Sequence, residues 1–281
     1  MKLRTLWLGI IILISVPTAA ALSINFFEEF PDNQTVKKAC ELNSSFQLYL
    51  AAEDLEQFYL FQSKIKACSS QTELIYWPTL TLEEGYWISP WSDPQALQEL
   101  FDKLINRTDQ TEMKIMLDLE PPIHKIQIWK RRKQAQENQA RIRQFLSSAE
   151  EHHLEIILVE KALPSWLTER VGLSYPERQN KRVQMYYSSF RRVLLPEVIV
   201  ETKLKQKLKQ AAAQDFSLGL GLIAPGIHGD EPTYSPEILA RELQWASLAG
   251  LREVVIFRLG GLTPEYLKVL EQFRENYREM R

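Results

Sequence analysis

Short apolar stretches alternate along the chain with longer segments in which apolar residues recur every three or four positions. Short apolar runs between turn residues are typical of buried strands, and the longer amphipathic segments are typical of helices. This pattern predicts strands over residues 23–30, 46–51, 73–77, 113–119, 154–159, 183–187, 216–223 and 253–257. It predicts helices over residues 34–42, 54–67, 93–105, 126–151, 196–213, 236–249 and 264–278.

Strands that alternate with helices indicate a parallel α/β architecture. A single (β/α)8 TIM-type barrel over residues 22–281 is the simplest closure of eight such units, and a length of about 250 residues is common for it. An open doubly wound sheet is the alternative. Against that alternative, no glycine-rich phosphate-binding turn follows the first strand.

The first 21 residues have the pattern of a secretory signal peptide. Lys2 and Arg4 precede an apolar run over residues 6–16, and small residues follow at 18–21. The run is shorter than the roughly 20 residues of a bilayer span. We therefore expect cleavage near Ala21, no membrane span in the mature chain, and export to the periplasm or the extracellular space. An uncleaved N-terminal anchor is the alternative.

Charge gives no reason to expect a nucleic-acid partner. The chain has 34 Lys and Arg against 36 Asp and Glu, and without the two basic residues of 1–21 the balance is 32 against 36, a net charge of −4. Long basic arms are also missing. A chain of this kind is not expected to bind nucleic acid.

The two cysteines, Cys40 and Cys68, stand at the ends of the first two predicted helices. Consecutive helices of a barrel are neighbours whose C-terminal ends lie on the same side, and export exposes thiols to oxidising conditions. The sequence therefore allows a Cys40–Cys68 disulfide. Two buried thiols are the alternative.

Acidic residues at the end of the fourth strand carry the sharpest chemical pattern, because barrel active sites lie at the carboxyl ends of the strands. Side-chain alternation places Met116, Asp118 and Glu120 on one face of this strand. Two carboxylates about 7 Å apart repel each other, which raises the pKa of one toward the range in which a general acid works. Asp118 and Glu120 are therefore the leading candidates for acid–base chemistry.

Other strand ends supply further carboxylates. Glu160 ends the fifth strand, and one of Glu28 and Glu29 at the end of the first strand is expected to face the barrel interior. Each of these would give Glu120 a partner of the kind that glycoside hydrolases use. A surface salt bridge is an equal alternative for Glu160.

The loop after the seventh strand and the end of the eighth add candidates for substrate binding, namely His228, Asp230 and Arg258, alongside Glu28. The chain has only four histidines and no paired ligand spacing, so we expect neither a metal site nor a cofactor. Arg258 suits either the clamping of an anionic substrate group or an ion pair with a carboxylate at the barrel mouth.

Aromatic residues gather after the third strand, and one more lies in the long loop after the fifth. Flat aromatic faces suit the apolar C–H faces of sugar rings, whereas packing of the loop onto the barrel is the alternative for each residue. The aromatic candidates for substrate binding are Tyr76, Trp77, Tyr86, Trp87, Trp91 and Trp166.

The end of the fourth strand resembles the catalytic strand end of the chitinase-type (family 18) glycosidases, whose fuller pattern is Asp-Gly-x-Asp-x-Asp-x-Glu. Asp118 and Glu120 match the last two acids of the pattern, and Met113 and Met116 stand at the two earlier acidic positions. The lysozyme-like family 25 also places Asp-x-Glu on a strand end.

The Met-x-Tyr motif on the sixth strand of family 18 matches residues 185–187, with Ser188 in place of the acid or amide that follows. The resemblance implies a barrel glycosidase in which Glu120 is the acid. It further implies that Asp118 orients a substrate acetamido group and that Tyr187 assists.

These patterns favour a secreted glycoside hydrolase that cleaves a polysaccharide or glycan with strand-end carboxylates. A non-catalytic barrel that binds glycan or a cell-surface partner is one alternative, and the two missing acids favour it. A metal-assisted phosphodiesterase or other hydrolase is another. The fold alone does not choose among them, because barrels host many chemistries.

Overall fold

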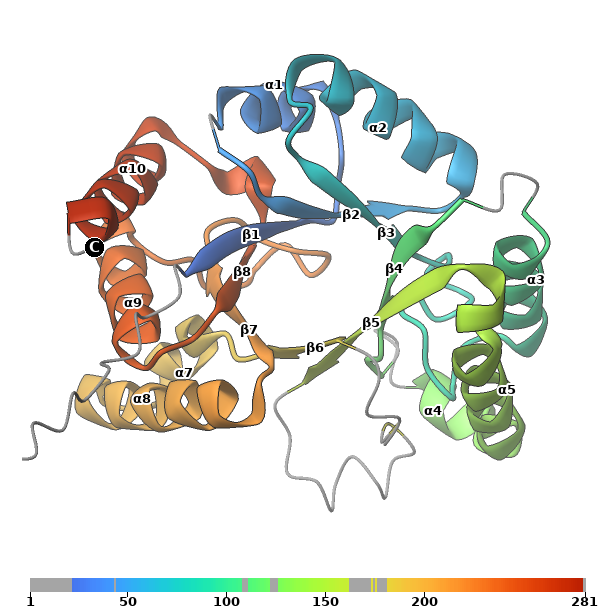
Figure 1. Ribbon diagram of the computed structural model, residues 1–281. Coiled ribbons are helices and arrows are strands. Elements are labelled where there is room, and N and C mark those ends of the chain that lie inside the picture. Colours follow the sequence, from blue (N-terminus) through green and yellow to red (C-terminus); the bar gives the residue numbers. More distant parts are fainter. Residues whose placement is uncertain are drawn as a thin grey trace, which may run out of the picture.

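Eight parallel strands close into a barrel in the order β1 to β8 (Figure 1), which confirms the predicted (β/α)8 fold and excludes the open sheet. The computed structural model describes residues 22–42, 44–107, 111–121, 126–161, 173, 175 and 181–279. The strands are β1 (Ser23–Glu28), β2 (Gln47–Ala52), β3 (Glu73–Pro78), β4 (Met113–Asp118), β5 (Leu154–Lys161), β6 (Lys181–Met185), β7 (Ser217–Leu222) and β8 (Glu253–Phe257). Trp166 and the segment 1–21 lie outside the described residues.

Helices surround the barrel and cover its outer face (Figure 1). They are α1 (Asn33–Glu41), α2 (Leu55–Cys68), α3 (Pro94–Ile105), α4 (Ile126–Lys130), α5 (Ala135–Ser148), α7 (Ser188–Leu194), α8 (Glu197–Gln214), α9 (Pro236–Leu248) and α10 (Pro264–Glu279), with 3-10 turns η1 (Glu150–His152) and η2 (Leu259–Gly261). No helix in the described part of the chain combines the length and the apolar character that a bilayer crossing requires.

Several helices begin where the sequence provides an N-terminal cap. The Asp54 carboxylate accepts a hydrogen bond from the backbone N–H of Gln57, which starts α2. Asp93 caps α3 and Ser235 caps α9, and in both helices a proline occupies the first turn. Such caps satisfy backbone N–H groups that lack a partner inside the helix.

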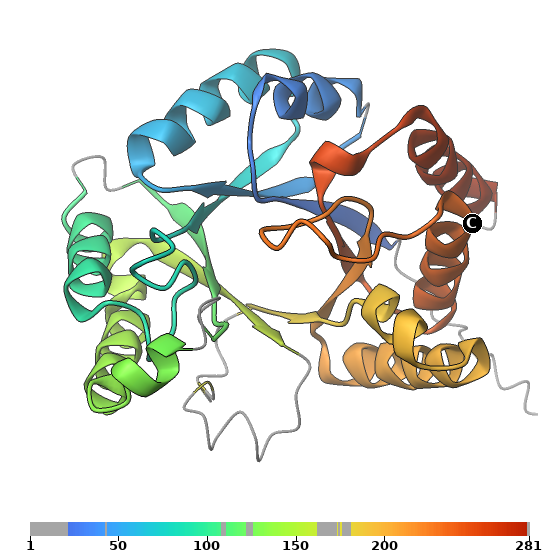
Figure 2. The same cartoon turned by 180° about the vertical axis from the view of Figure 1, so that it is seen from behind.

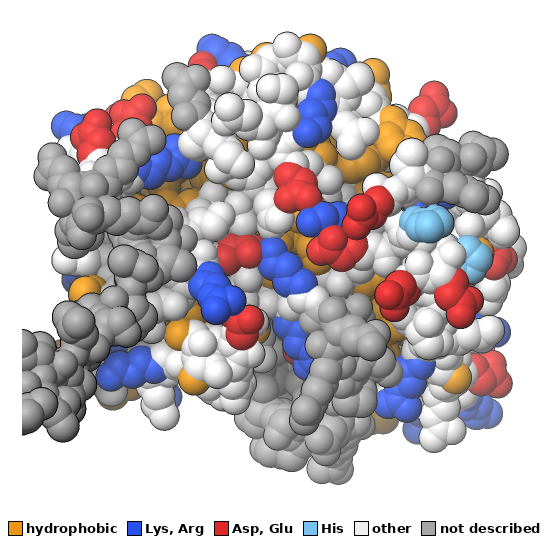
Figure 3. Space-filling model, in the orientation of Figure 1, with side chains coloured by type: hydrophobic (Ala, Val, Ile, Leu, Met, Phe, Trp, Pro, Cys, Tyr) orange, Lys and Arg blue, Asp and Glu red, His pale blue; other side chains and the backbone are white. Residues whose placement is uncertain are grey.

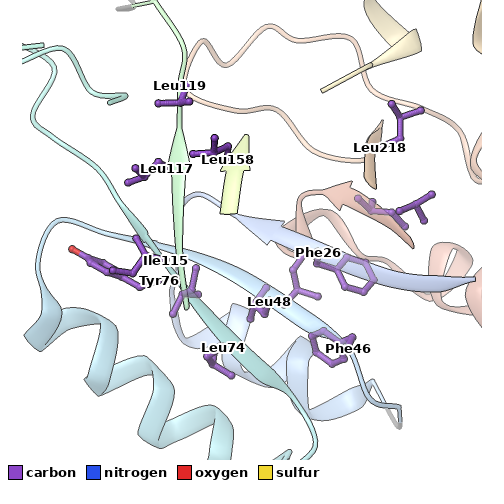
Figure 4. Close-up of a cluster of buried hydrophobic side chains, with 14 of the residues drawn as sticks. Phe26, Phe46, Leu48, Leu74, Tyr76, Ile115, Leu117, Leu119, Leu158 and Leu218 are labelled. Atoms are coloured by element: carbon purple, nitrogen blue, oxygen red, sulfur yellow. The ribbon is translucent and has the colours of Figure 1, made fainter. Parts of the chain in front are cut away.

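Alternating side chains divide the apolar residues into an outer and an inner core. The outer core, between strands and helices, holds Ile115, Leu117 and Leu158 (Figure 4). The inner core, inside the barrel, holds Met116 and Ile157 from the same two strands. Because neighbouring residues of a strand face opposite sides, this division fixes which strand-end side chains point into the barrel.

Ion pairs close the barrel at the amino-terminal ends of the strands. Lys114 lies 2.8 Å from Glu73 and 3.2 Å from Glu155. Lys181 lies 2.6 Å from Glu253. Acidic and basic side chains accordingly lie next to one another over the centre of this face (Figure 3).

The helix predicted over residues 126–151 is wrong as a single element, because the chain turns between α4 and α5. Arg131 begins this turn, and its guanidinium donates hydrogen bonds to the backbone carbonyls of Glu83, Glu84 and Trp91. Arg131 therefore lies against the loop after β3. Tertiary hydrogen bonds to the loop after β3 override the helical pattern.

The sixth strand lies two residues earlier than predicted, at Lys181–Met185 instead of 183–187. Its last predicted residues leave the ladder because Tyr187 precedes α7, a helix that the pattern did not predict. Tyr187 nevertheless keeps the inward direction of the alternation, packed against the inner core.

Cys40 and Cys68 form a disulfide between α1 and α2, with 5.5 Å between their Cα atoms. This outcome replaces the alternative of two free thiols.

Reduction of this disulfide is expected to lower the free energy of unfolding by about 3–4 kcal/mol, because the bond closes a loop with a sequence separation of 28 and restricts the unfolded chain. Urea unfolding with and without reductant measures the loss. The double variant Cys40→Ala/Cys68→Ala serves as control and should unfold identically in both conditions. The prediction would be contradicted if the urea midpoint of the wild-type protein did not change with reductant while mass spectrometry showed two free thiols.

Candidate active site

A cavity of about 410 Å³ opens at the carboxyl ends of the strands. Figure 2 shows this end of the barrel, with the segment between β7 and α9 reaching over the opening. Four carboxylates and a set of aromatic rings line the cavity. They are Glu29, Asp118, Glu120 and Glu231, with Trp77, Trp87, Tyr187, Phe190 and Phe257.

The end of β4 brings Asp118 and Glu120 into this cavity, as the alternation predicted. Asp118 is only 3% exposed, and its Oδ1 has no hydrogen-bond partner among the described residues. Burial, followed by the charge of Glu120, raises the pKa of Asp118 well above its usual value. The ionised form of Asp118 is therefore disfavoured, and its unpartnered oxygen is available to form a hydrogen bond with a ligand.

Glu120 forms an ion pair with Lys161, at 2.5 Å between Oε2 and Nζ. The same ammonium lies 5.4 Å from the ring centroid of Trp87, in cation–π geometry. Burial lowers the pKa of Lys161, but Glu120 outweighs this effect and the net shift is upward. Lys161 is thus a charged group that holds Glu120 in place. Alternation from Val159 could have identified it in the sequence.

At the end of β1, Glu29 enters the cavity and Glu28 does not. The side chain of Glu28 is fully buried on the outer side, where it accepts hydrogen bonds from the backbone N–H groups of Phe30 and Gly260. It also pairs with Arg258 at 2.9 Å. Of these two candidates, Glu29 is therefore the one that lines the cavity. Arg258 forms the ion pair foreseen as its alternative role.

Glu29 has the pKa that a general acid needs. Burial raises its pKa to about 7, against the lowering effects of a hydrogen bond from Tyr86 and the charge of Arg258. Glu231 and Glu120 raise it further.

Glu231 reaches the cavity from the loop after β7. A Cβ on Gly226 would lie 2.9 Å from Glu29 Oε2 and 3.1 Å from Glu231 Oε1, so the two oxygens are separated by no more than the sum, 6.0 Å. The absence of a side chain on Gly226 therefore provides the space that the two carboxylates occupy. Glu231 was visible in the sequence, but no periodicity in a loop could show that its side chain turns inward.

His228 lies at the same opening, and Asp230 does not line the cavity. The ring of His228 meets Trp87 at 6.4 Å between centroids, and its backbone N–H donates to Glu231 Oε1 at 3.1 Å. Among the described residues, no three His, Cys, Asp or Glu side chains are grouped so as to hold a metal ion.

The aromatic candidates divide between the cavity and the outer core. Trp77 and Trp87 line the cavity, and Tyr86 stands behind it as the hydrogen-bond donor to Glu29. Tyr76 and Trp91 belong to the outer core and do not line this cavity. Tyr76 points away from the barrel interior because it neighbours the inward-facing Trp77 in the same strand.

Tyr187 lines the cavity and Glu160 does not. Burial, followed by the charges of Glu120 and Asp118, raises the pKa of Tyr187 well above its usual value, so its hydroxyl stays protonated. Glu160 follows the inward-facing Val159 and thus turns outward, 3.7 Å from Arg182. The salt-bridge alternative for Glu160 is the one that the structure contains.

No protein-family model matches the sequence, and no curated protein matches it. Among solved structures, a xylose isomerase domain protein from Planctomyces limnophilus aligns with a TM-score of 0.53 and 11% identity, over 93% of this chain and 99% of that chain. The HpcH/HpaI aldolase from Desulfitobacterium hafniense DCB-2 aligns with a TM-score of 0.39 and 9% identity, over 90% and 93% of the two chains. The first similarity supports the barrel fold alone, and the second is too low to carry an argument.

Proposed function

We propose that the protein is a glycoside hydrolase whose active site is the cavity at the carboxyl ends of the strands. The observation that carries the proposal is a set of three buried polar atoms without a hydrogen-bond partner among the described residues: Trp77 Nε1, Asp118 Oδ1 and Glu231 Oε2. Buried polar atoms are normally paired. All three side chains line one cavity, beside the ring of Trp87. A sugar, with hydroxyl groups that donate and accept, would pair all three atoms and stack on the ring.

The chemistry follows from the two kinds of carboxylate in the cavity. Glu29, with a pKa of about 7, is the general acid that protonates the leaving oxygen. Glu120, held by Lys161, is the carboxylate that attacks the sugar or activates water. This assignment differs from the one that the family 18 resemblance implies, in which Glu120 is the acid. Asp118 and the protonated hydroxyl of Tyr187 bind and orient the substrate.

An amine nucleophile is the rival chemistry that a lysine at a strand end would suggest. A lysine that attacks a carbonyl group needs a lowered pKa, so that the neutral amine is available. The pKa of Lys161 is instead raised, because its ion pair with Glu120 outweighs burial. This shift favours a supporting role for Lys161 in a carboxylate mechanism.

Trp77→Phe is expected to weaken oligosaccharide binding about 2- to 10-fold, because it removes one hydrogen-bond donor and keeps the aromatic face. The ligand is first identified in a panel of neutral, acidic and amino-sugar oligosaccharides, and its affinity is then measured by calorimetry. Trp91→Phe is the matched control, since Trp91 packs in the outer core. Equal losses in both variants, or none in either, would contradict the role of Trp77.

We also propose that residues 1–21 are a signal peptide and that the mature protein is exported. The apolar run after Lys2 and Arg4 supports this proposal, as does the Cys40–Cys68 disulfide. N-terminal sequencing of the protein recovered from expressing cells tests it. A mature chain that still begins at Met1 and remains in the cytoplasm would rule it out.

A further inference from the structure

The candidate active site is the inner end of a longer cleft. A second hollow of about 660 Å³ shares Glu29 and Ile227 with the cavity. A third, of about 940 Å³, lies between α2 and α3 and shares Glu53, Thr79 and Thr81 with the second. The three hollows therefore adjoin one another, and together they extend from the barrel mouth across the ends of β1 to β3 to the side of the barrel. A path of this kind fits a chain-like ligand, not a single small molecule.

The outer part of this cleft is strongly acidic. The second hollow contains acidic residues and no Lys or Arg, and the third contains six acidic residues against Lys103 and Arg107. Arg107 is buried and directs its guanidinium to backbone carbonyls, those of Leu104 and His153 among them. Acidic residues still outnumber basic ones in the third hollow by six to two.

Some of these acids have structural tasks, but others are free to meet a ligand. Asp54 caps α2, and Glu84 bonds to Thr81 within a turn. The carboxylates of Glu53, Glu56 and Glu83 are exposed and form no ion pair in the described part of the chain. At the inner end of the path, Asp118 and Trp77 are 3% and 2% exposed and offer unpartnered polar atoms. The cleft thus has buried, unpartnered polar atoms at its inner end. Exposed carboxylates line its outer part, which we call the acidic track.

We propose that this cleft binds a linear polycationic glycan, a chain of amino sugars with free, protonated amines. The proposal rests on the proposed function, and it adds the class of substrate. Protonated amines along the chain would meet the carboxylates of the second and third hollows, while one sugar ring occupies the cavity between Trp77 and Trp87. Neutral N-acetylated chains have the same sugar backbone but lack the charges, so the acidic track would give them no advantage.

The test measures the affinities of the full mature protein for a glucosamine hexamer and an N-acetylglucosamine hexamer, at low and high salt. We expect the charged hexamer to bind roughly tenfold more tightly at low salt, and added salt to remove most of the difference, because exposed charges are screened. The triple variant Glu53→Gln/Glu56→Gln/Glu83→Gln should weaken binding of the charged hexamer by roughly threefold or more and leave the neutral hexamer unchanged. The control Glu112→Gln/Glu150→Gln/Glu151→Gln removes the same charge at the opposite end of the barrel and should have no effect.

The outcomes separate this proposal from the function that it rests on. Equal affinity for both hexamers, with no effect of the triple variant, would overturn the polycationic substrate and leave the glycoside hydrolase standing. Failure of both hexamers and of every other oligosaccharide to bind would overturn the proposed function itself. A lysine hexapeptide could also bind as tightly as the glucosamine hexamer, with the same dependence on Glu53, Glu56 and Glu83. That result would indicate that the cleft binds basic peptides and would overturn the proposal of a glycan ligand.

Discussion

Replacing Glu120 by Gln is expected to lower the turnover number on a glycan substrate by about 100- to 10,000-fold, with the fold retained. The amide keeps the size of the side chain but removes the carboxylate that pairs with Lys161 in the cavity. Because a single carboxylate carries the attack in both glycosidase mechanisms, no other group in the cavity should replace it. Initial rates on a chromogenic glycoside measure the loss, and circular dichroism confirms the fold.

Glu160→Gln is the matched control for this experiment. It makes the same chemical change near the end of an adjacent strand, but Glu160 faces outward to Arg182 and does not line the cavity. Its activity should stay within about twofold of wild type, because Glu160 does not line the cavity and the change keeps the size of the side chain. Full activity in Glu120→Gln would remove Glu120 from the mechanism. Tight glycan binding without turnover by the wild-type protein would indicate a non-catalytic binder.

The activity of the wild-type protein is expected to fall as the pH rises through about 7, because Glu29 must be protonated to act as the acid. The alkaline limb of kcat/KM against pH reports this group in the free protein. Tyr86→Phe should move the limb to higher pH, because the hydrogen bond from Tyr86 lowers the pKa of Glu29. A limb that stays in place in Tyr86→Phe would show that another group controls the profile.

The same shift predicts how stability depends on pH. The pKa of Glu29 is raised from 4.5 to about 7 in the folded protein, so its contribution to stability is fully present below 4.5 and is lost as the pH rises to about 7. This pKa shift corresponds to about 3 kcal/mol in the free energy of unfolding. The figure is not reduced for solvent screening, because the Glu29 carboxyl is almost wholly buried. Glu29→Gln should therefore unfold at a higher denaturant concentration than wild type at pH above 7, and the advantage should vanish in acid. Denaturant midpoints across this pH range provide the measurement.

The barrel and one side of its candidate active site could be predicted from the sequence because both depend on periodicity. Strand alternation placed Asp118 and Glu120 together inside the barrel, which the cavity bears out. The same rule, applied from the inward-facing Val159 and Trp77, places Lys161 inside the barrel and Glu160 and Tyr76 outside it. Judging residues only by chemical type at a strand end does not reveal these directions.

Other features had no local signal at all. Which of Glu28 and Glu29 faces inward depends on the register of β1 in the sheet, which is set by its pairing with β2 and β8. The inward turn of Glu231 depends on a loop and on the space left by Gly226. The turn at Arg131 depends on carbonyl groups about 45 residues away in sequence. Contacts of this kind arise only once the chain has folded.

The ion pairs of Lys114 and Lys181 at the amino-terminal end of the barrel have a consequence for how a polymer is handled. They connect five strands across this end of the barrel, whereas the candidate active site opens at the opposite end. A polymeric ligand of the candidate active site would therefore enter and leave at the carboxyl ends of the strands.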